Sequence, residues 1–547
     1  MIELSEEVTI PEIFFQVSKK YARFPLFIIP ANSARAYAKE GLELSYDDCA
    51  QSVKELMLRY QHAGYGVGHR VGLLLENRPE HFLHKLAMNA LGICCVPLNS
   101  DHRAGEMAYV INHAQLDFVV VIDELVSLLK DAIAISQHQC PIVHLHSSKL
   151  FPNSRTPCES TTPNSETIAS ILYTSGTTGQ PKGCLLSHRY ELAAGAWYVN
   201  RQGLATFGEA CERIYNPLPV FHVNAGILTF YGAMLKGNCQ IQTDRFQTLR
   251  WIQEIHDTKA TVVHYLGVVV PMLLNQPQHE LEKKHQVRFA IGAGVDPQRH
   301  QEFEDRFGYP LIEIWGMTEM VRLIFDADQP RKVGTRCFGR TQQGLDVRVV
   351  NDHGEKVSDG APGEMLIRYS AEKPRQDFFS GYLKDQEATE YAWRGGWFHT
   401  GDIVTRDPDG FLHFVERRKN IIRRSGENIA AAEVEAVLQT HPAVLQAAVL
   451  SVQDELREEE VLACVVLKDY SLQSLSMGIE EPIVKDLFEH CNQHLAYFKA
   501  PGWLFFTDQI PTTGTQKIQK HQIFPSDLDP RDTPGIIDLR SWKKRNR

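Results

Sequence analysis

Short apolar runs alternate with segments of helical apolar spacing through the first 400 residues of the chain. Val71–Leu75 and Phe118–Ile122 predict buried strands, and Pro79–Leu91 between them predicts a helix that leads into another strand, Ile93–Leu98. The same rhythm returns in four later runs that predict strands: Ile168–Tyr173, Thr261–Tyr265, Arg288–Ile291 and Leu311–Trp315. Strands that alternate with helices favour a mainly parallel sheet with helices packed on its faces.

Beyond Gly344 the pattern changes to short strands separated by turn sequences such as Asn351–Gly354 and Asp407–Gly410. The runs that predict strands here are Val347–Val350, Met365–Arg368 and Phe411–Val415. Closely spaced short strands with tight turns are typical of a small, largely antiparallel β unit. A basic segment, Arg417–Arg424, then interrupts the pattern.

The chain after this basic segment predicts a separate α+β domain. Its predicted elements are helices at Ala431–Leu438 and Ile483–Leu495 and strands at Ala447–Val452 and Val461–Leu467. We therefore expect an α/β protein with a large N-terminal domain over residues 1–418, built of helix-flanked, mainly parallel sheets plus the β unit. A smaller C-terminal domain follows over residues 419–524. Residues 525–547 hold three prolines and a basic end, which is typical of a loosely held, flexible tail.

The composition excludes several classes of protein. Lys and Arg number 57 against 67 Asp and Glu, and this net charge of −10 lacks the concentrated positive charge that nucleic-acid binding needs. The longest apolar runs are far shorter than the roughly 20 residues of a membrane-spanning helix. The acidic N-terminus has no basic region followed by an apolar one. We expect a cytoplasmic protein without nucleic-acid partners or integral membrane association, and an oligomer is compatible with the sequence.

Cysteine and histidine spacing predicts neither a disulfide framework nor a metal site. The eleven cysteines are an odd number, form no CxxC pair, and in several cases lie in apolar surroundings such as LGICCVPLN. Buried free thiols are the simpler interpretation. The 23 histidines include no HExxH or comparable ligand spacing, so we expect structural or surface roles for nearly all of them.

The segment Ile171–Gly183, ILYTSGTTGQPKG, has the composition of a phosphate-binding loop. A β-run ends at Tyr173 and opens into a hydroxyl- and glycine-rich stretch with a lysine: Thr174, Ser175, Gly176, Thr177, Thr178 and Lys182. Glycines let the backbone approach an anion closely, hydroxyl and amide groups donate to phosphate oxygens, and lysine adds positive charge. The segment is not a Walker A loop, because GxxxxGK[ST] is absent. By composition alone, a flexible turn is the alternative.

In this residue order the segment resembles the phosphate loop of the adenylate-forming superfamily. That superfamily contains acyl-CoA synthetases, adenylation domains of peptide synthetases and firefly-type luciferases. A second segment, Trp315-Gly316-Met317-Thr318-Glu319, resembles a further motif of the family. The resemblance implies that Trp315 and Gly316 lie against adenine, that Thr318 contacts the α-phosphate and that Glu319 binds Mg²⁺, which prefers oxygen ligands. Taken alone, Trp315 would be a core residue and Glu319 a solvated charge.

Other stretches match the family in its order along the chain. Gly292-Ala293-Gly294 falls where the family lines the adenine face with small residues, although Val295 replaces the usual proline. GWFHTGD, which ends at Asp402, resembles the segment whose aspartate accepts hydrogen bonds from both ribose hydroxyls, while a turn residue is the plainer interpretation of Asp402. Arg417 follows at the position of an arginine that contacts ribose or phosphate.

The resemblance also implies a hinge and a mobile C-terminal domain. Lys419 occupies the family's hinge position, where an ordinary solvated charge is the alternative. Glu416 stands where glycine is common, and Asn420 where aspartate is common. Gly426, in SGENI, matches a glycine loop that lines the tunnel for the pantetheine arm of CoA. Lys517, in PTTGTQKIQK, matches the adenylation lysine, with Lys520 as a rival three residues later.

The resemblance implies an ATP-dependent acid–CoA ligase that uses ATP, Mg²⁺ and coenzyme A. A carboxylic acid, the small-molecule partner, first becomes an acyl-adenylate with release of pyrophosphate. The C-terminal domain then rotates and the CoA thiol takes the acyl group. Lys517 offsets charge in the first step, and His222 matches an aromatic position that flanks the substrate carboxylate, with a core histidine as the alternative.

Within the superfamily, the sequence most resembles CoA ligases for small or medium organic acids. FVERRKN followed by GEN is similar to crotonobetaine/carnitine–CoA ligases. The sequence does not name the acid. Three other functions stay open: an adenylation protein that loads the phosphopantetheine of a carrier protein, a luciferase-like oxidative enzyme, and a non-catalytic nucleotide-binding relative.

Overall fold

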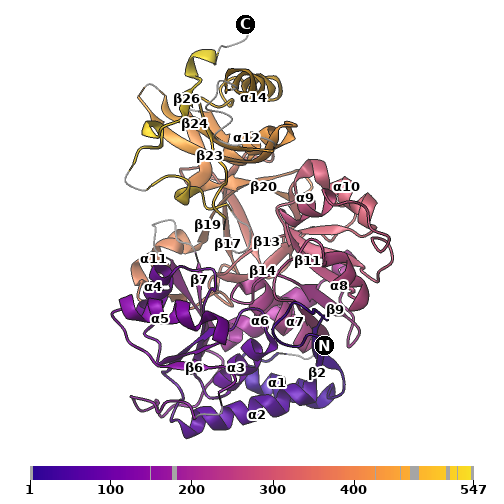
Figure 1. Ribbon diagram of the computed structural model, residues 1–547, viewed down its shortest axis with the longest axis vertical. Helices are drawn as coiled ribbons and strands as arrows, with labels where there is room; N and C mark the ends of the chain where they lie inside the picture. The colour runs from indigo at the N-terminus through magenta and orange to yellow at the C-terminus, as the bar shows by residue number, and fades with distance from the viewer. Residues whose placement is uncertain are drawn as a thin grey trace. The chain divides into compact units, whose positions relative to one another are not determined.

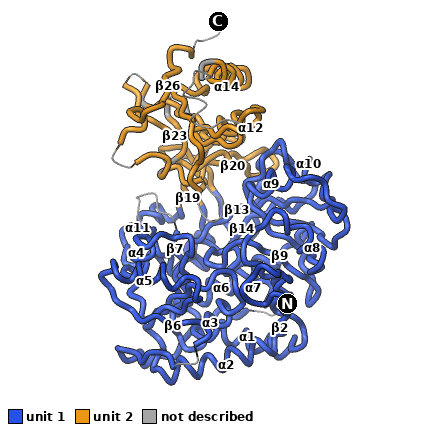
Figure 2. The backbone as a smooth tube through the Cα atoms, in the orientation of Figure 1, with its two compact units in different colours: residues 1–347, 367–398 blue, residues 348–366, 399–547 orange. Residues whose placement is uncertain are grey.

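The computed structural model describes residues 4–147, 150–174, 181–424, 427–455, 457–468, 480–512, 518–525 and 528–543. The chain divides into two compact units (Figure 2). The larger unit comprises residues 1–347 and 367–398, and the second unit comprises residues 348–366 and 399–547. Each unit contains sheets covered by helices (Figure 1).

The larger unit holds two sheets. The first runs in the order β14-β13-β12-β11-β9-β10-β1-β2. Its strands are β1 (Pro25–Ile29), β2 (Leu42–Ser45), β9 (Arg213–Asn216), β10 (Cys239–Gln242), β11 (Val262–Leu266), β12 (Phe289–Ala293), β13 (Leu311–Met317) and β14 (Met320–Phe325). All neighbours pair in parallel except β2 and β14 at the two edges. Parallel neighbours require long crossovers, and the chain supplies them as helices.

One face of this sheet is covered by α8 (Trp251–Asp257), α9 (Val269–Leu274) and α10 (Pro297–Phe307). Trp251 and Phe303 from these helices lie fully buried in one cluster with the strand residue Val263. Apolar spacing along each short helix therefore fixes which face packs on the sheet.

The second sheet of the larger unit runs in the order β18-β8-β7-β4-β3-β5-β6. Its strands are β3 (Arg70–Leu74), β4 (Cys94–Pro97), β5 (Phe118–Val121), β6 (Ile142–His144), β7 (Ile168–Thr174), β8 (Lys182–Ser187) and β18 (Gly381–Tyr382). The helices α3 (Pro79–Ala90), α4 (Ala104–Ala114) and α5 (Val126–Ile135) connect its parallel strands. The helix α6 (His188–Val199) contacts strands of both sheets. The predicted alternation of strand and helix is confirmed.

The second unit begins with an antiparallel β unit. Its strands are β16 (Asp346–Val350), β17 (Gly363–Arg368), β19 (Phe398–Arg406) and β20 (Leu412–Arg417), in the order β20-β19-β17-β16. β19 and β20 pair antiparallel with Asp402 opposite Arg417. The strands predicted in this region are present, and the antiparallel direction is confirmed for β19 and β20.

The rest of the second unit is an α+β arrangement. Its elements are β21 (Ile421–Arg424), β22 (Glu427–Ala430), α12 (Ala431–Thr440), β23 (Val444–Asp454), β24 (Glu458–Leu467), α14 (Glu480–His494), β25 (Trp503–Phe506) and β26 (Ile536–Asp538). The sheet runs β22-β21-β24-β25-β26, and β23 pairs with β24. Leu438 of α12 and Leu487 of α14 share one buried cluster with Ala463 of β24.

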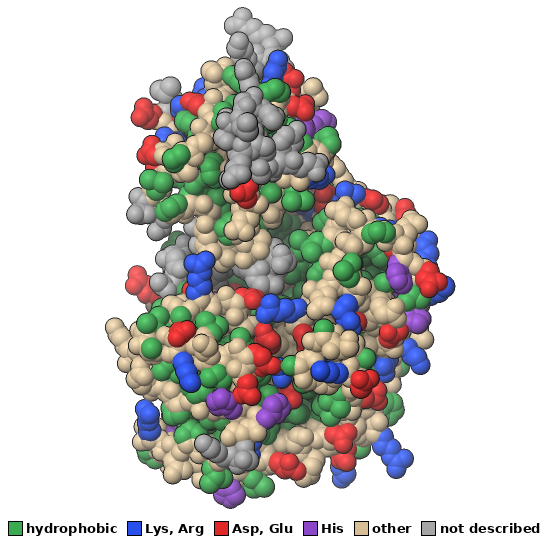
Figure 3. Space-filling view, viewed as in Figure 1, with side chains coloured by type: hydrophobic (Ala, Val, Ile, Leu, Met, Phe, Trp, Pro, Cys, Tyr) green, Lys and Arg blue, Asp and Glu red, His purple; other side chains and the backbone are tan. Residues whose placement is uncertain are grey.

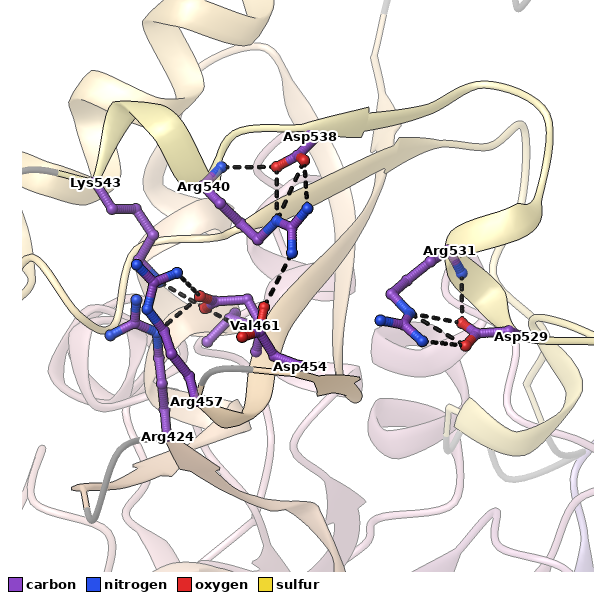
Figure 4. Close-up of polar contacts among 10 residues, drawn as sticks. Arg424, Asp454, Arg457, Val461, Asp529, Arg531, Asp538, Arg540 and Lys543 are labelled. Carbon is purple, nitrogen blue, oxygen red and sulfur yellow. Dashed lines mark hydrogen bonds and ion pairs between the residues drawn. The ribbon is translucent and has the colours of Figure 1, made fainter.

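The prediction of a loosely held tail is wrong for the described residues 528–543. β26 pairs antiparallel with β25, and Leu539 is buried in the core beneath α12 and α14. The Lys543 ammonium, fully buried, donates to Glu460 at 2.7 Å (Figure 4). Prolines and basic residues dominate the composition here, so the few apolar residues that pair and pack were not visible as a pattern.

The structure also describes the cysteines and the lengths of the helices. All eleven cysteines are described, none is paired, and nine are buried, so the prediction of free thiols is confirmed. Among the residues that the structure describes, no helix is long and apolar enough to cross a membrane. On the face of the larger unit that Figure 3 shows, acidic and basic side chains are interspersed.

Candidate active site

The segment predicted to bind phosphate connects β7 and β8, two antiparallel strands of the second sheet. Thr174 ends β7, Lys182 begins β8, and the two residues face each other in the ladder. Ser175, Gly176, Thr177 and Thr178, predicted to bind phosphate, lie outside the described residues. The Lys182 ammonium is 4.0 Å from the Asp385 carboxylate and 4.9 Å from the centre of the Tyr382 ring. Its side chain is a quarter exposed, so the positive charge lies at the surface of the strand end.

Thr318 and Glu319 form the two-residue turn of the hairpin between β13 and β14. Met317 and Met320 pair on either side of them. The Thr318 carbonyl oxygen accepts a hydrogen bond from the Tyr190 hydroxyl at 2.7 Å. The Glu319 carboxylate is 7% exposed and accepts a hydrogen bond from the Tyr382 hydroxyl at 2.8 Å. Both residues of the turn are therefore held by tyrosines from elsewhere in the larger unit.

Tyr382 contacts both Lys182, at the start of β8, and Glu319, the carboxylate expected to bind Mg²⁺. It lies on β18, opposite Cys184 of β8, and its ring contacts Lys182 while its hydroxyl reaches Glu319. Burial, followed by the negative charge of Glu319, raises the pKa of Tyr382 well above its ordinary value. The hydroxyl therefore stays protonated and remains a donor. Sequence reasoning missed this residue, and the short run around it carries no motif that marks it.

Of the three small residues predicted to face adenine, Gly292 and Ala293 end β12 and Gly294 follows it. Gly292 lies between Tyr265 and Glu313 on the neighbouring strands, and a Cβ atom here would stand 2.4 Å from the Tyr265 carbonyl oxygen. Gly294 has φ +83°, a conformation that side chains rarely adopt. The Ala293 carbonyl accepts a hydrogen bond from the backbone of Gly267 at 2.9 Å. Close backbone approach therefore requires glycine at position 292.

The Glu313 carboxylate fixes the backbone that follows β12. Its buried carboxylate accepts the backbone N–H groups of Gly294 at 3.0 Å and Val295 at 2.7 Å. Burial raises the pKa of Glu313 to about 7, against the lowering effect of these two hydrogen bonds. The proline usual at position 295 has no N–H, so valine supplies a donor that proline lacks. Sequence reasoning did not single out Glu313.

The parallel strands place several predicted residues at one edge of the first sheet. The carboxyl ends of β11, β12 and β13 lie side by side, which brings Gly292-Ala293-Gly294 next to Trp315 and Gly316. Ligands of open α/β sheets bind at this edge. Trp315 is 6% exposed, and its ring lies 6.1 Å from that of Phe338.

His222 follows β9 at the same edge of the sheet. It is half-buried, with its ring 4.7 Å from that of Phe221. Its backbone carbonyl accepts a hydrogen bond from Gly226 at 2.9 Å, at the start of the π-helical turn Asn224–Thr229. His222 is therefore not a fully buried core histidine.

Asp402 and Arg417, predicted to contact ribose, form an ion pair in the second unit. The Arg417 Nε atom lies 2.7 Å from the Asp402 carboxylate, across the ladder between β19 and β20. Asp402 is fully buried, whereas the Arg417 side chain is 43% exposed. Asp402 also donates its backbone N–H to the Thr400 hydroxyl at 3.1 Å. The Asp402 carboxylate is thus held in position by its ion pair with Arg417.

The two C-terminal residues with implied roles, Lys517 and Gly426, lie outside the described residues. Thr512 and Ile518, on either side of the segment with Lys517, form an isolated β-bridge. The rival lysine, Lys520, pairs with the Glu435 carboxylate at 2.8 Å. Its charge is therefore engaged within the second unit.

The buried carboxylate of Glu460 pairs with Arg424, which directly precedes the segment predicted to form the glycine loop. Glu460 is fully buried and pairs with Arg424 at 2.7 Å, with Lys543 at 2.7 Å and with Arg457 at 3.7 Å (Figure 4). Burial lowers the pKa of Lys543 to about 8, against the attraction of Glu460. Several cationic partners offset the cost of burying this charge, whereas an unpaired buried carboxylate would have no such compensation.

The donors at the site fit Mg²⁺ bound together with a nucleotide. Within the described part of the chain, no group of three or more His, Cys, Asp or Glu side chains could hold a metal ion by itself. Mg²⁺ in nucleotide enzymes is typically held by one or two carboxylates together with substrate phosphates. Glu319, next to the phosphate strand, supplies one such carboxylate.

Comparison with known proteins identifies the family of the chain. The profile of the AMP-binding enzyme family matches residues 30–383, and that of the AMP-binding enzyme C-terminal domain matches residues 433–517. The crotonobetaine/carnitine–CoA ligase of Proteus mirabilis is 28% identical over 502 residues, which cover 88% of this chain and 93% of that protein. The sulfoacetate–CoA ligase of Cupriavidus necator is 27% identical over 498 residues, 88% of this chain and 92% of that protein.

Solved structures with the same fold carry nucleotide ligands. The anthranilate CoA ligase AuaEII in complex with anthranoyl-AMP superposes with a TM-score of 0.78 at 22% identity, over 94% of this chain and 96% of that one. ATP-bound MatB from Rhodopseudomonas palustris gives a TM-score of 0.76 at 22% identity, over 94% and 98%. The α/β fold predicted from the sequence is confirmed, and the chain belongs to the AMP-binding enzyme family, among its AMP-forming acyl-CoA ligases.

Proposed function

We propose that this protein activates a small carboxylic acid with ATP, as an acyl-adenylate, and then transfers the acyl group to the thiol of CoA. The main support for the proposal is that Tyr382 contacts both Lys182 and Glu319. These contacts bring the start of β8 and a buried carboxylate to one place in the larger unit.

In the first half-reaction, the substrate carboxylate attacks the α-phosphorus of ATP and pyrophosphate leaves. Thr174 and Lys182 hold the phosphates beyond the α-position, and Thr318 contacts the α-phosphate itself. Glu319 would bind Mg²⁺ with its carboxylate, and the ion, when bound, offsets charge on the phosphates. Tyr382 keeps the Glu319 carboxylate in position through its hydroxyl.

The nucleotide is recognised at two further places. Gly292, Ala293 and Gly294 form the wall against which adenine lies, and Trp315 and Gly316 form the other side. Glu313 supports this wall by fixing the amides of Gly294 and Val295. Asp402 accepts hydrogen bonds from the two ribose hydroxyls, and Arg417 pairs with the same carboxylate.

The two half-reactions use different arrangements of the chain. Residues 419–524 form a domain that rotates relative to residues 1–418 about Lys419. In one arrangement Lys517 stabilises the charge that builds at the α-phosphate, and in the other Gly426 lines the path of the pantetheine arm. One surface cannot present both Lys517 and a thiol tunnel to the same carbonyl group. This alternation is supported by the two different roles that the resemblance gives to residues of one domain.

The acyl pocket lies at the carboxyl edge of the first sheet, next to His222. The half-buried imidazole is placed to flank the substrate carboxylate, and Tyr265 lies fully buried behind Gly292. A small or carnitine-like acid fits the names of the curated relatives, and the reaction belongs in the cytoplasm, where ATP and CoA are both available.

A panel of carboxylic acids in a pyrophosphate-release assay, run with and without CoA, tests the proposal. One acid should give pyrophosphate without CoA in a single turnover and continuous release with CoA. Glu319→Gln should abolish both signals, whereas Glu390→Gln, an exposed change on α11 (Gln386–Ala392), should leave them intact. Transfer to a carrier-protein phosphopantetheine instead of CoA would replace the proposed acceptor. Binding of ATP with no acid-dependent pyrophosphate release would overturn the proposed activity.

A further inference from the structure

A buried carboxylate spans the proposed hinge of the second unit. Glu416, at the end of β20, is 5% exposed and accepts three hydrogen bonds. Its Oε1 atom accepts from the backbone of Arg417 at 2.7 Å and from the side-chain amide of Asn420 at 3.2 Å. Its Oε2 atom accepts from the backbone of Ala432 at 2.8 Å. Both carboxylate oxygens are therefore used.

These contacts lie on both sides of Lys419. Glu416 precedes the proposed hinge, whereas Asn420 and Ala432 follow it, and Ala432 belongs to the first turn of α12. The residue at the N-cap of α12 is Ala430, which has no side-chain hydrogen-bonding group. A carboxylate from another element thus takes the place of the missing cap and meets the positive end of the helix dipole.

The helix that Glu416 holds is part of the core of its domain. Val434 and Leu438 of α12 are fully buried in one cluster with residues of β23, β24 and α14. A restraint on the first turn of α12 therefore restrains the domain as a body. We propose that Glu416 is a positioning residue that fastens this domain across Lys419 and must release Ala432 before the domain can turn.

Asn420 completes this clasp because its side chain is a neutral amide that can donate a hydrogen bond. The two positions at which the sequence departs from the common pattern around the hinge are in contact, with a carboxylate at 416 and an amide at 420. A second carboxylate at 420 would lie against the first, and like charges at this distance repel. The amide donates a hydrogen bond instead. The carboxylate and the amide are thus matched to each other.

The clasp affects the balance between the half-reactions, and in this respect the inference rests on the proposed function. Release of Ala432 leaves a buried carboxylate with fewer donors and an uncapped helix, and both changes are unfavourable. The clasp therefore stabilises one arrangement relative to the other. Its removal should accelerate the half-reaction that uses the other arrangement and slow the half-reaction that uses this one.

Single-turnover measurements on three variants test the proposal. Glu416→Ala removes the clasp, Asn420→Asp sets two carboxylates together, and Glu416→Gln with Asn420→Asp exchanges carboxylate and amide. The two rates to be measured are acid-dependent pyrophosphate release and acyl transfer from presynthesised acyl-AMP to CoA. The first two variants should move these rates in opposite directions, with their ratio shifted roughly tenfold or more, the factor for one hydrogen bond to a charged group. The exchange variant should recover part of the original ratio, because the new amide at position 416 can donate to the carboxylate at position 420 and still accept from Ala432, but its single oxygen cannot also accept from Arg417.

Glu433→Gln is the matched control, because it removes a carboxylate from the same turn of α12 without touching the clasp; Glu433 pairs with Lys499 at the surface. It should leave the ratio unchanged. A parallel fall of both rates in Glu416→Ala would mean a merely structural role and would overturn the proposal, as would an unchanged ratio.

Hydrogen exchange gives a readout that does not depend on activity. The amide of Ala432 should exchange faster in Glu416→Ala and Asn420→Asp than in the wild type, and not in Glu433→Gln. Unchanged exchange at the start of α12 would overturn the clasp even if the rates differed. A wild-type protein that releases no pyrophosphate with any acid would instead refute the proposed function, while the exchange data would still decide the clasp.

Discussion

The Tyr382 hydroxyl donates to the Glu319 carboxylate across a contact of 2.8 Å, although 63 residues separate them along the chain. The same tyrosine ring lies beside the Lys182 ammonium. One aromatic side chain therefore coordinates the positions of a cation and an anion that the proposed reaction needs together. Both residues belong to the larger unit: Tyr382 lies on β18, and Glu319 lies in the hairpin turn after β13.

We predict that Tyr382→Phe slows adenylation while the protein stays folded. The change removes the donor to Glu319 but keeps the ring beside Lys182. Loss of a hydrogen bond to a charged group should reduce single-turnover pyrophosphate release by roughly tenfold or more. Tyr391→Phe is the control, because Tyr391 is 67% exposed. Unaltered pyrophosphate release in Tyr382→Phe would show that Glu319 needs no such support.

We predict that Lys517, and not Lys520, is the adenylation lysine. Lys520 already pairs with Glu435 at 2.8 Å, so its charge is engaged within the second unit. Lys517→Ala should slow pyrophosphate release by roughly 10²–10³-fold, the loss typical of one electrostatic stabiliser, and should leave acyl transfer from presynthesised acyl-AMP to CoA almost unchanged. Lys520→Ala is the comparison. If the two variants exchange these behaviours, the assignment is reversed.

We predict that Asp402→Ala weakens ATP binding by about 1.5–3 kcal/mol, the range for hydrogen bonds to a charged group. The variant should remain folded, because its ion-pair partner Arg417 is 43% exposed and can be solvated by water. Isothermal titration calorimetry with ATP measures the change, and circular dichroism checks the fold. An affinity equal to that of the wild type would exclude a ribose-binding role for Asp402.

We predict that Glu460→Gln destabilises the second unit by about 3–5 kcal/mol, the cost of leaving buried charges without their partner. The carboxylate pairs with Arg424 and Lys543, both of them buried (Figure 4). Urea unfolding followed by tryptophan fluorescence measures the difference. Glu489→Gln, on the exposed side of α14, serves as the reference. Equal stabilities of the two variants would mean that the buried cluster adds nothing to folding.

We predict that the larger unit loses stability on acidification below about pH 6.5. Burial lowers the pKa of His81, His84 and His264 to about 3, so the folded chain keeps these rings neutral. The unfolded chain protonates them near the ordinary pKa of 6.5. Stability therefore falls as pH drops from 6.5 toward 3, by about 1.4 kcal/mol per pH unit for each such ring.

Urea midpoints at pH 7 and pH 5 measure this dependence. His264→Gln should reduce the pH dependence, and His62→Gln, an exposed change on α2 (Tyr46–His62), should not. Glu313 acts in the opposite sense, because its pKa is raised to about 7 and its contribution is lost as pH rises through that value. A midpoint that does not change between pH 7 and pH 5 would contradict the prediction.

Local patterns in the sequence were sufficient for most of the fold. β3, α3 and β4 follow the predicted ranges to within a residue, because alternation of apolar runs and helical spacing is a local property. Thr174, Lys182, Thr318 and Glu319 were found through motifs that are themselves local. The structure places Lys182 and Glu319 in contact with Tyr382, and Thr318 in contact with Tyr190.

Contacts between distant segments could not be predicted in this way. Tyr382 has no motif, and it reaches Glu319 only because β18 pairs with β8. Glu416 was noted as a departure from a pattern, but its bond to Ala432 depends on where α12 begins. Lys543 looked like part of a solvated basic end, and only the position of Glu460 makes it a buried cation. Each of these pairings is decided by tertiary packing rather than by sequence spacing.

The late position of β26 in the chain has a consequence for biosynthesis. β25 pairs with β24 on one side, and among the described residues of this unit β26 alone pairs with its other edge. A released chain that lacks Ile536–Asp538 would present an uncovered edge of β25, the kind of surface to which chaperones and other incomplete chains bind.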